Sequence, residues 1–308
     1  MSLKVFVVGA SGYIGGAVAA LLAENEYTVK GLTRSKDKAA EMKKQGIEPV
    51  VGEMSDAALL TKHAQEADIV VNAADSDDAE TVKTLIKALE GTDKVLIHTS
   101  GSSIVSDQAN GEPSDKVFKE DAKFTPEAEK KARVAIDNEV LAAGKQGIRS
   151  VVICPCLIYG ESKGVNSESQ QVPALIKQAI ESGVVRCVGR GENTWSTIHI
   201  QDLAQLYMAV IKAAPEGGVF FFAESGETTF KQIAEKIREA LKIKAAVEEW
   251  PIAEASKKWG KGMAVFALGS NSRIRGERAR KLGWLPTQES VIDDIPRCCN
   301  QLTAKAGK

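Results

Sequence analysis

The chain has 308 residues, of which 44% are apolar and 26% charged, so it is long enough to bury a full core, and we expect one compact unit with two lobes. Its formal net charge is −1, and it has neither a polybasic tail nor an apolar run that could span a membrane. These properties exclude a general nucleic-acid or membrane binder and favour a small-molecule ligand.

The most informative stretch runs from Lys4 to Gly16. An apolar run, Val-Phe-Val-Val, is followed by three glycines at three-residue spacing and then by a strong helix former, Ala-Val-Ala-Ala-Leu-Leu-Ala. This order of strand, glycine turn and helix start is typical of a dinucleotide-binding site, in which the helix N-terminus receives the pyrophosphate. The three glycines are Gly9, Gly12 and Gly15.

Strands and helices alternate after this turn, which predicts a doubly wound parallel sheet. We expect strands at Tyr27 to Thr33, Val50-Val51, Asp68 to Ala74 and Lys94 to Ser100, and helices at Ser35 to Lys44, from Ser55 and at Asp78 to Leu89. The first strand begins almost at once and leaves no room for a leader, so we expect a cytoplasmic protein.

The second half of the chain changes character. Gly101 to Thr125 is expected to be a long surface excursion, and Tyr159 to Gln171 a loop that leaves the sheet. Further elements are expected as helices at Pro126 to Ala143, Pro173 to Glu181, Asp202 to Ala213, Phe230 to Leu241 and a last basic one at Arg273 to Leu282, and as strands at Arg149 to Ile153, Val185 to Val188 and from Val219.

The predicted fold is therefore α/β, with a Rossmann sheet and a smaller, mixed α/β C-terminal lobe on the substrate side. We assign residues 1–158, with 185–215 returning to it, to the Rossmann domain, and 159–184 and 216–308 to the smaller lobe. The five cysteines are odd in number and lack Cys-x-x-Cys spacing, so they are interpreted as reduced thiols, and no metal is expected.

Arg34 follows the second predicted strand, where an acidic side chain would bind the ribose diol of NAD. An arginine can instead form a charge-assisted contact with the 2′-phosphate of NADP. Because positions 33 and 34 carry no acid, the sequence favours NADP(H) over NAD, although a solvated arginine at a helix start is the alternative.

Five segments together resemble the extended short-chain dehydrogenase/reductases, the NAD(P)-dependent epimerase/dehydratase group. They are the glycine turn, Asn72-Ala-Ala, Cys154-Pro-Cys-Leu-Ile-Tyr-Gly, Ile198-His-Ile-Gln-Asp-Leu-Ala and Arg278-Ala-Arg-Lys-Leu-Gly-Trp-Leu-Pro. The resemblance covers nearly the whole chain and implies the fold and the cofactor. The cofactor-binding residues assigned on these grounds are Gly9, Ser11, Gly12, Tyr13, Ile14, Gly15, Arg34, Met54, Ala73, Ala74, Thr99, Pro155 and Leu157.

The family's catalytic tyrosine and lysine, four residues apart on the helix after the fifth strand, have no counterpart here. Counting back from Pro155 places the tyrosine position on residues 131–133 and the lysine position on residues 135–137, and neither range contains the residue required. Hydroxyls survive at the end of the fifth strand, so Ser100 and Ser102 are candidate catalytic residues, although one register puts Gly101 at the serine position.

Tyr159-Gly-Glu-Ser-Lys163 does have the Tyr-x-x-x-Lys spacing, so Tyr159 is a third catalytic candidate, but a structural place in the cleft wall is favoured. His199 and Asp202 are expected to start a structural helix. Trp195 stands where the family often has an arginine that holds a nucleotide-sugar diphosphate, which argues against such a substrate.

Two functions remain open at this point. One is an NADP(H)-dependent oxidoreductase or epimerase-like enzyme that acts on a small carbonyl compound with a non-standard proton donor. The other is a non-catalytic NADP(H)-sensing protein, as in the nitrogen-metabolite-repression regulators, which the chain also resembles in lacking the Tyr/Lys pair. A homodimer is expected from the family.

Overall fold

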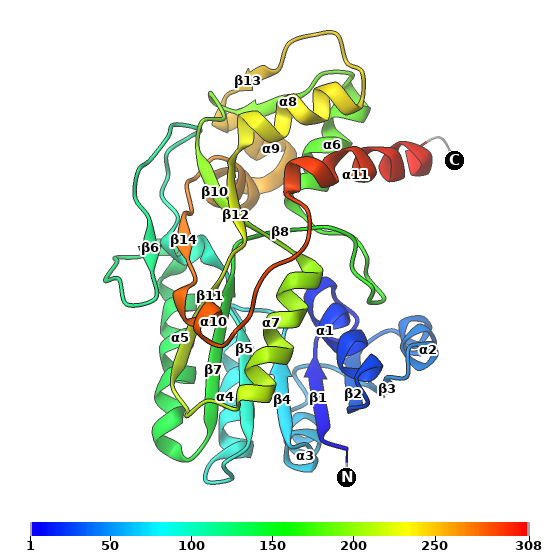
Figure 1. The fold of residues 1–308 in the computed structure, drawn as a ribbon, viewed down its shortest axis with the longest axis vertical. Coiled ribbons are helices and arrows are strands. Elements are labelled where there is room, and N and C mark those ends of the chain that lie inside the picture. The colour runs from blue at the N-terminus through cyan, green and yellow to red at the C-terminus, as the bar shows by residue number, and fades with distance from the viewer. Residues whose placement is uncertain (1, 307–308) are drawn as a thin grey trace.

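A seven-stranded parallel sheet forms the centre of the computed structural model, which describes residues 2–306 (Figure 1). Its strand order is β3-β2-β1-β4-β5-β7-β11, which confirms the predicted Rossmann arrangement. The strands are β1 (Lys4–Val8), β2 (Thr28–Thr33), β3 (Glu48–Val51), β4 (Ile69–Asn72), β5 (Val95–Thr99), β7 (Arg149–Pro155) and β11 (Val219–Ala223).

Helices cover both faces of this sheet, which is why its central strands are apolar throughout (Figure 1). One face carries α1 (Tyr13–Glu24), α2 (Lys36–Lys44) and α7 (Ile200–Ala213). The other carries α3 (Ala57–Glu66), α4 (Ala79–Leu89) and α5 (Lys131–Ala142).

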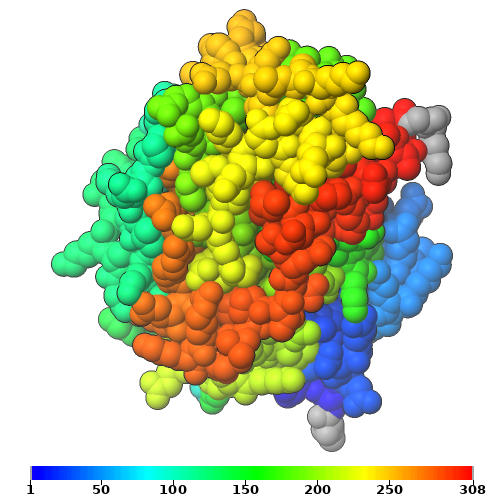
Figure 2. Space-filling model, turned by 45° about the horizontal axis from the view of Figure 1, so that its top comes forward, coloured from blue at the N-terminus to red at the C-terminus, as the bar shows by residue number. Residues whose placement is uncertain are grey.

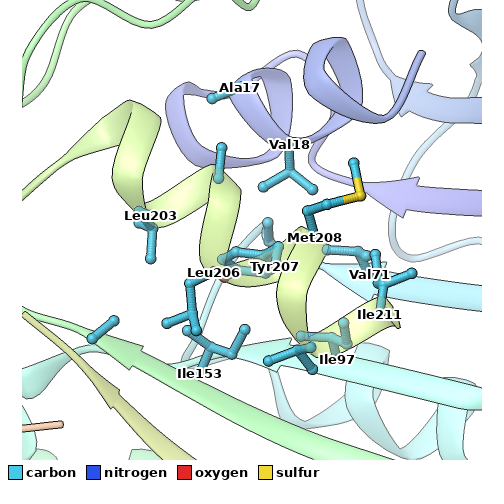
Figure 3. Close-up of a cluster of buried hydrophobic side chains, with 14 of the residues drawn as sticks. Ala17, Val18, Val71, Ile97, Ile153, Leu203, Leu206, Tyr207, Met208 and Ile211 are labelled. Carbon is cyan, nitrogen blue, oxygen red and sulfur yellow. The ribbon is translucent and has the colours of Figure 1, made fainter. Parts of the chain in front are cut away.

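The largest core cluster lies between α7, α1 and the sheet (Figure 3). Leu206 and Tyr207 of α7 point toward Ile97 and Ile153 of the sheet, and Val18 of α1 lies beside them. Burial of one such aliphatic side chain contributes about 1.5–3 kcal/mol to folding. This packing fixes α1, and with it the glycine turn, on the edge where the strands end.

The smaller lobe has its own core and two small sheets. One sheet holds β8 (Leu157–Tyr159), β10 (Thr194–His199) and β12 (Gly226–Thr229), and the other pairs β9 (Arg186–Val188) with β13 (Glu248–Trp250). The lobe's helices are α6 (Gln171–Ser182), α8 (Phe230–Ala240), α9 (Ile252–Met263) and α11 (Val291–Ala306). Figure 2 shows the red α11 lying against the yellow segment that contains α8.

The chain passes between the lobes more than once. Within residues 185–215, α7 packs on the main sheet, whereas β9 lies in the small lobe. β11, from the range 216–308, is the edge strand of the main sheet. The excursion at residues 101–125 contains β6 (Phe118–Lys119), which attaches it to the rest of the fold by pairing with β14 (Ile274–Arg275).

The prediction of a helix over the whole of Arg273 to Leu282 was wrong. Ile274 and Arg275 form strand β14, and only Glu277–Lys281 is helical, as α10. The backbone bends at Gly276, where a Cβ atom would lie 2.2 Å from the carbonyl oxygen of Phe222. The sequence also missed β10, α9 and the terminal helix α11. No helix within residues 2–306 is both long and apolar enough to cross a membrane.

Candidate functional site

The glycine turn joins β1 to α1 at the carboxyl edge of the sheet, in a conformation that side chains would obstruct. Gly9 has a φ of +85°, and a Cβ atom there would lie 2.7 Å from the carbonyl oxygen of Ala73. A Cβ atom at Gly15 would lie 2.4 Å from the carbonyl oxygen of Gly9. The backbone of the first turn of α1 therefore packs directly against the backbone after β1, which in turn packs directly against the backbone after β4.

The N-terminus of α1 differs from those of its neighbours on the sheet. Its N-cap, Gly12, makes no side-chain cap hydrogen bond, and its first turn contains no acidic residue. By contrast, α2, α3 and α4 are capped by Ser35, Asp56 and Asp78, respectively. The free N–H groups of the first turn of α1 therefore face the cleft and suit an anion such as a pyrophosphate.

A cleft of about 840 Å³ runs along this edge between the main sheet and the small lobe. Its volume is in the range of small-molecule and cofactor sites. Its lining includes eleven of the residues that the sequence assigned to the cofactor or to catalysis: Gly9, Ser11, Gly12, Tyr13, Ile14, Arg34, Met54, Ala73, Ala74, Ser102 and Pro155.

The other five assigned residues lie off the cleft wall. Gly15 is used for helix packing, and Leu157 is 1% exposed in the core of the small lobe. Thr99 shares a 2.6 Å hydrogen bond with the hydroxyl of Tyr207 on α7. The remaining two, Ser100 and Tyr159, are described below.

Arg34 is a charged group of the cleft with 78% of its side chain open to solvent. Thr33, the last residue of β2, is buried, so no carboxylate stands at the strand end. Glu53 is the nearest acid, 3.9 Å from Arg34 Nε, and Lys38 lines the same end of the cleft. This end therefore presents two cations to a ligand.

Ser100 belongs to a buried polar cluster below the cleft floor. Its hydroxyl donates a 2.7 Å hydrogen bond to Asp137 Oδ2 on α5, and His98 Nδ1 lies 3.2 Å from the amide nitrogen of Asn72. His98 Nε2 and Asp137 Oδ1 are 3.7 Å apart, and neither has a hydrogen-bond partner.

Burial shifts the pKa of both titratable groups of this cluster so that the neutral form of each is favoured. Removal from water raises the pKa of Asp137 to about 7, against the opposing effect of the Ser100 hydrogen bond. Removal from water also lowers the pKa of His98 to about 4, with a further contribution from the nearby Arg133 charge. This pair could not be predicted from the sequence, because the burial of Asp137 depends on how α5 packs.

Arg133 and Asp137, four residues apart, are the α5 side chains that face the end of β5. Arg133 lines the cleft and donates a 3.1 Å hydrogen bond from Nη1 to Ser103 Oγ, and its Nε donates to Asp77 Oδ1 over 2.8 Å. In the two alternative registers, Lys131, Ala132 and Ala135 are exposed. α5 itself contains no tyrosine.

The hydroxyl groups of Tyr159 and Tyr13 both donate to backbone carbonyl oxygens. Tyr159 is buried and donates a 2.6 Å hydrogen bond to the carbonyl oxygen of Glu289, away from the cleft, and burial raises the pKa of its hydroxyl well above its usual value. Tyr13 lines the cleft, but its hydroxyl donates to the carbonyl oxygen of Gly160.

His199 and Asp202 have the structural role that was expected. The His199 side chain caps α7 by accepting from the backbone N–H of Gln201, and Asp202 accepts from the backbone N–H groups of Thr287 and Gln288. Within residues 2–306, no three metal-ligating side chains form a cluster that could hold an ion.

Comparisons with curated proteins find relatives over the whole chain. It is 31% identical over 350 residues to "Oxidase ucsJ" of Acremonium sp., covering 100% of this chain and 99% of the relative. It is 24% identical over 313 residues to the 4-hydroxy-2-methyl-3-oxo-4-farnesyl-3,4-dihydroquinoline-1-oxide ketoreductase of Stigmatella aurantiaca, covering 91% and 90% of the two chains.

Solved structures share the fold at low sequence identity. The dTDP-glucose 4,6-dehydratase of Bacillus anthracis, in complex with NAD, matches with a TM-score of 0.77 at 16% identity, covering 99% of this chain and 98% of that one. The UDP-glucuronic acid 4-epimerase of Bacillus cereus, in complex with UDP-glucuronic acid and NAD, matches with a TM-score of 0.76 at 17% identity, covering 97% and 100%.

The model of one protein family matches residues 5–221, a range that includes the glycine turn, α5 and the buried cluster. Together with the full-length relatives, this match shows the family directly. The chain belongs to the NAD dependent epimerase/dehydratase family.

Proposed function

We propose that this protein is an NADP(H)-dependent oxidoreductase that acts on a small, uncharged carbonyl compound. One observation carries the choice of cofactor: Arg34 is largely exposed at the end of β2, in the same cleft as the uncapped N-terminus of α1, and Thr33 stands where an acid would bind the NAD ribose. An exposed guanidinium there suits the 2′-phosphate of NADP(H), which NAD lacks.

The residues of the cleft fit such a dinucleotide. The first turn of α1 offers backbone N–H groups to the pyrophosphate, and the absence of a Cβ at Gly9 and Gly15 lets α1 lie close to the sheet edge. Ala73, Ala74 and Pro155 line the wall toward α5. When bound, the nicotinamide supplies or accepts a hydride.

The names of relatives support redox chemistry on carbonyl compounds. One is called an oxidase, one a ketoreductase, and a third, 27% identical over 246 residues, a 2-alkyl-3-oxoalkanoate reductase. Two of these names describe ketones that carry alkyl or farnesyl groups, one of them also with a carboxylate, and neither describes a nucleotide sugar. Trp195 in the cleft, with its indole N–H donated to the carbonyl oxygen of Ser270, agrees with that class of ligand.

A second function, NADP(H) sensing without turnover, is favoured by α5. That helix has no phenol to exchange a proton with a substrate, and its inward-facing residues are Arg133 and Asp137 instead. A protein that has lost the family's Tyr/Lys pair in this way could still bind the cofactor and report its state to a partner.

The test of the cofactor is a comparison of NADPH and NADH binding by fluorescence titration of the whole chain. We expect tighter NADPH binding, and we expect Arg34→Ala to lose about tenfold to a hundredfold in NADPH affinity with little change for NADH. Lys43→Ala, an exposed charge at the far end of α2, is the matched control. Equal affinity for the two cofactors, or a preference that survives Arg34→Ala, contradicts the assignment.

The test of turnover is NADPH oxidation with a panel of alkyl and aryl ketones, with bound cofactor confirmed first. Oxidation that depends on the ketone excludes the sensing function. Tyr159→Phe is expected to retain the activity, because its hydroxyl is bonded to Glu289 away from the cleft. Cofactor binding without oxidation of NADPH by any member of the panel favours the sensor.

A further inference from the structure

We propose that Arg133 is the group that binds the carbonyl oxygen of the substrate, through Nη1. The inference rests on the proposed function, because it concerns the same cleft and the same ligand class. It gives the chain an oxygen-binding donor on α5, a helix that contains no tyrosine.

The position of the guanidinium is fixed from two sides. Nε and Nη2 both donate to the carboxylate of Asp77, and Nη1 donates to Ser103 Oγ over 3.1 Å. The side chain is only 14% exposed, and the exposed part lines the cleft. Since Nη1 carries two hydrogens and Ser103 accepts one, a second donor is available to a ligand.

Gly101 provides the room for this arrangement. A Cβ atom on Gly101 would lie 3.2 Å from Arg133 Nη1, closer than side chains usually approach. The guanidinium therefore occupies the space beside the end of β5 that a serine side chain at position 101 would need. In the register that places Gly101 at the family's serine position, a serine side chain would therefore crowd Arg133 Nη1.

The charges around Arg133 favour a neutral oxygen over an anion. Asp77 neutralises the guanidinium directly, and Asp75 and Glu168 line the same cleft. The other cations of the cleft, Arg34 and Lys38, lie at its α1 end. A carboxylate or diphosphate at Arg133 would thus compete with Asp77 for the guanidinium, whereas a ketone needs only the hydrogen bond.

The walls of the cleft supply the apolar part of the ligand site. Ile158, Trp195, Met263 and Ala267 line it from the side of the small lobe. These four side chains give the apolar part of a ketone, such as an aryl alkyl ketone, a surface to pack on while Arg133 Nη1 binds its single oxygen.

The experiment uses the whole chain loaded with NADP⁺, so that no reduction takes place, and compares three probes by ligand-observed NMR titration. Acetophenone carries the carbonyl oxygen, ethylbenzene has a similar shape without it, and benzoate is the anion. We expect wild type to bind acetophenone about tenfold more tightly than either of the others. We expect Arg133→Met to lose that preference and Arg133→Lys to retain part of it.

Arg149→Met is the matched control, because Arg149 forms the same fork on Asp93 through Nε and Nη2 at the opposite end of the strands. It should leave the acetophenone preference unchanged. Gly101→Ala should weaken acetophenone binding by displacing Nη1, with no substitution of Arg133 itself.

A wild type without any preference for acetophenone, or a preference that survives in Arg133→Met, overturns the inference. NADPH affinity is measured for every variant and stays within twofold of wild type if only the oxygen anchor is affected. Failure of wild type to bind NADPH would instead contradict the proposed function. The two failures are therefore distinguishable.

Discussion

The two ends of the cleft are built from different parts of the chain. At the α1 end, the glycine turn presents backbone N–H groups to the ligand, its own Cβ positions are closed by contacts as short as 2.4 Å, and Arg34 and Lys38 add two cations. At the α5 end, side chains are bonded to one another: Arg133 in the cleft donates to Asp77 and Ser103, and Ser100 donates to Asp137 in the buried cluster below it. The glycine turn leaves no room for an added atom, whereas the α5 end can change its chemistry by substitution of side chains.

The largest expected effect is that of an added methyl group at the backbone end. Gly9→Ala places a Cβ atom 2.7 Å from the carbonyl oxygen of Ala73 at a φ of +85°, so backbone must move. We expect a loss of about 2–4 kcal/mol in the free energy of unfolding, measured by urea denaturation, and loss of NADPH binding.

Gly46→Ala is the matched control for Gly9→Ala. Gly46 has a similar φ of +74°, but the nearest atom to its Cβ would be 3.9 Å away. Its cost is therefore the left-handed backbone alone, about 1 kcal/mol. If the two variants lose the same free energy of unfolding, the close packing at Gly9 has no effect on stability beyond that of the left-handed backbone.

At the side-chain end, the buried pair predicts a pH dependence. With a folded pKa of about 7, Asp137 takes up a proton on folding, so its contribution to stability falls as the pH rises from about 4 to 7. With a folded pKa of about 4, His98 releases a proton on folding below pH 6.5, so its contribution rises over nearly the same interval. In wild type, the two slopes largely cancel.

Asp137→Asn should expose the slope of His98. We expect the free energy of unfolding of this variant to rise by about 2–3 kcal/mol between pH 4.5 and 6.5, relative to wild type, at a slope of at most about 1.4 kcal/mol per pH unit. His98→Gln should show the opposite trend. Urea denaturation at four pH values checks both, and parallel curves for the three proteins would contradict the assignment of the pair.

Much of the fold could be predicted because its signals are local. The apolar run before Gly9, the glycine spacing and the starts of the helices after Ser35 and at Phe230 are each contained in a few consecutive residues, and the structure has all of them. The next helix was expected to begin at Ser55. In the structure it is capped by Asp56 and begins at Ala57.

The α5 end could not be predicted, because its signals are not local. Asp137 is an unremarkable helix residue until α5 packs on the sheet and places it 2.7 Å from Ser100, 37 positions earlier. The basic segment that was expected to be helical contains β14, whose partner β6 lies in the excursion at 101–125. Pairings of this kind depend on the whole topology rather than on periodicity.

Variants of Thr99 test whether this residue belongs to the cleft or to the protein core. Its hydroxyl is bonded to Tyr207 in the core under α7, although the sequence assigned Thr99 to the cofactor. Thr99→Val and Tyr207→Phe should each cost about 1–2 kcal/mol of unfolding free energy, because each leaves one buried hydroxyl unpaired, and the double variant should cost less than their sum.

NADPH titration of these variants decides the cofactor assignment of Thr99. We expect neither variant to change NADPH affinity more than twofold. Weaker binding in Thr99→Val but not in Tyr207→Phe would show that Thr99 reaches the cofactor as well.

The smallest expected effect concerns the cap beside Arg34. Ser35 Oγ accepts a 3.3 Å hydrogen bond from the backbone N–H of Lys38, so Ser35→Ala should lower the free energy of unfolding by about 0.5–1 kcal/mol. Thr229→Ala, which removes the cap of α8 in the other lobe, should cost a similar amount and serves as the control. Because Arg34 is positioned by the end of β2 and not by the cap, Ser35→Ala should keep its preference for NADPH over NADH in fluorescence titration. Loss of that preference, with Thr229→Ala unaffected, would mean that the cap of α2 as well as the end of β2 positions Arg34.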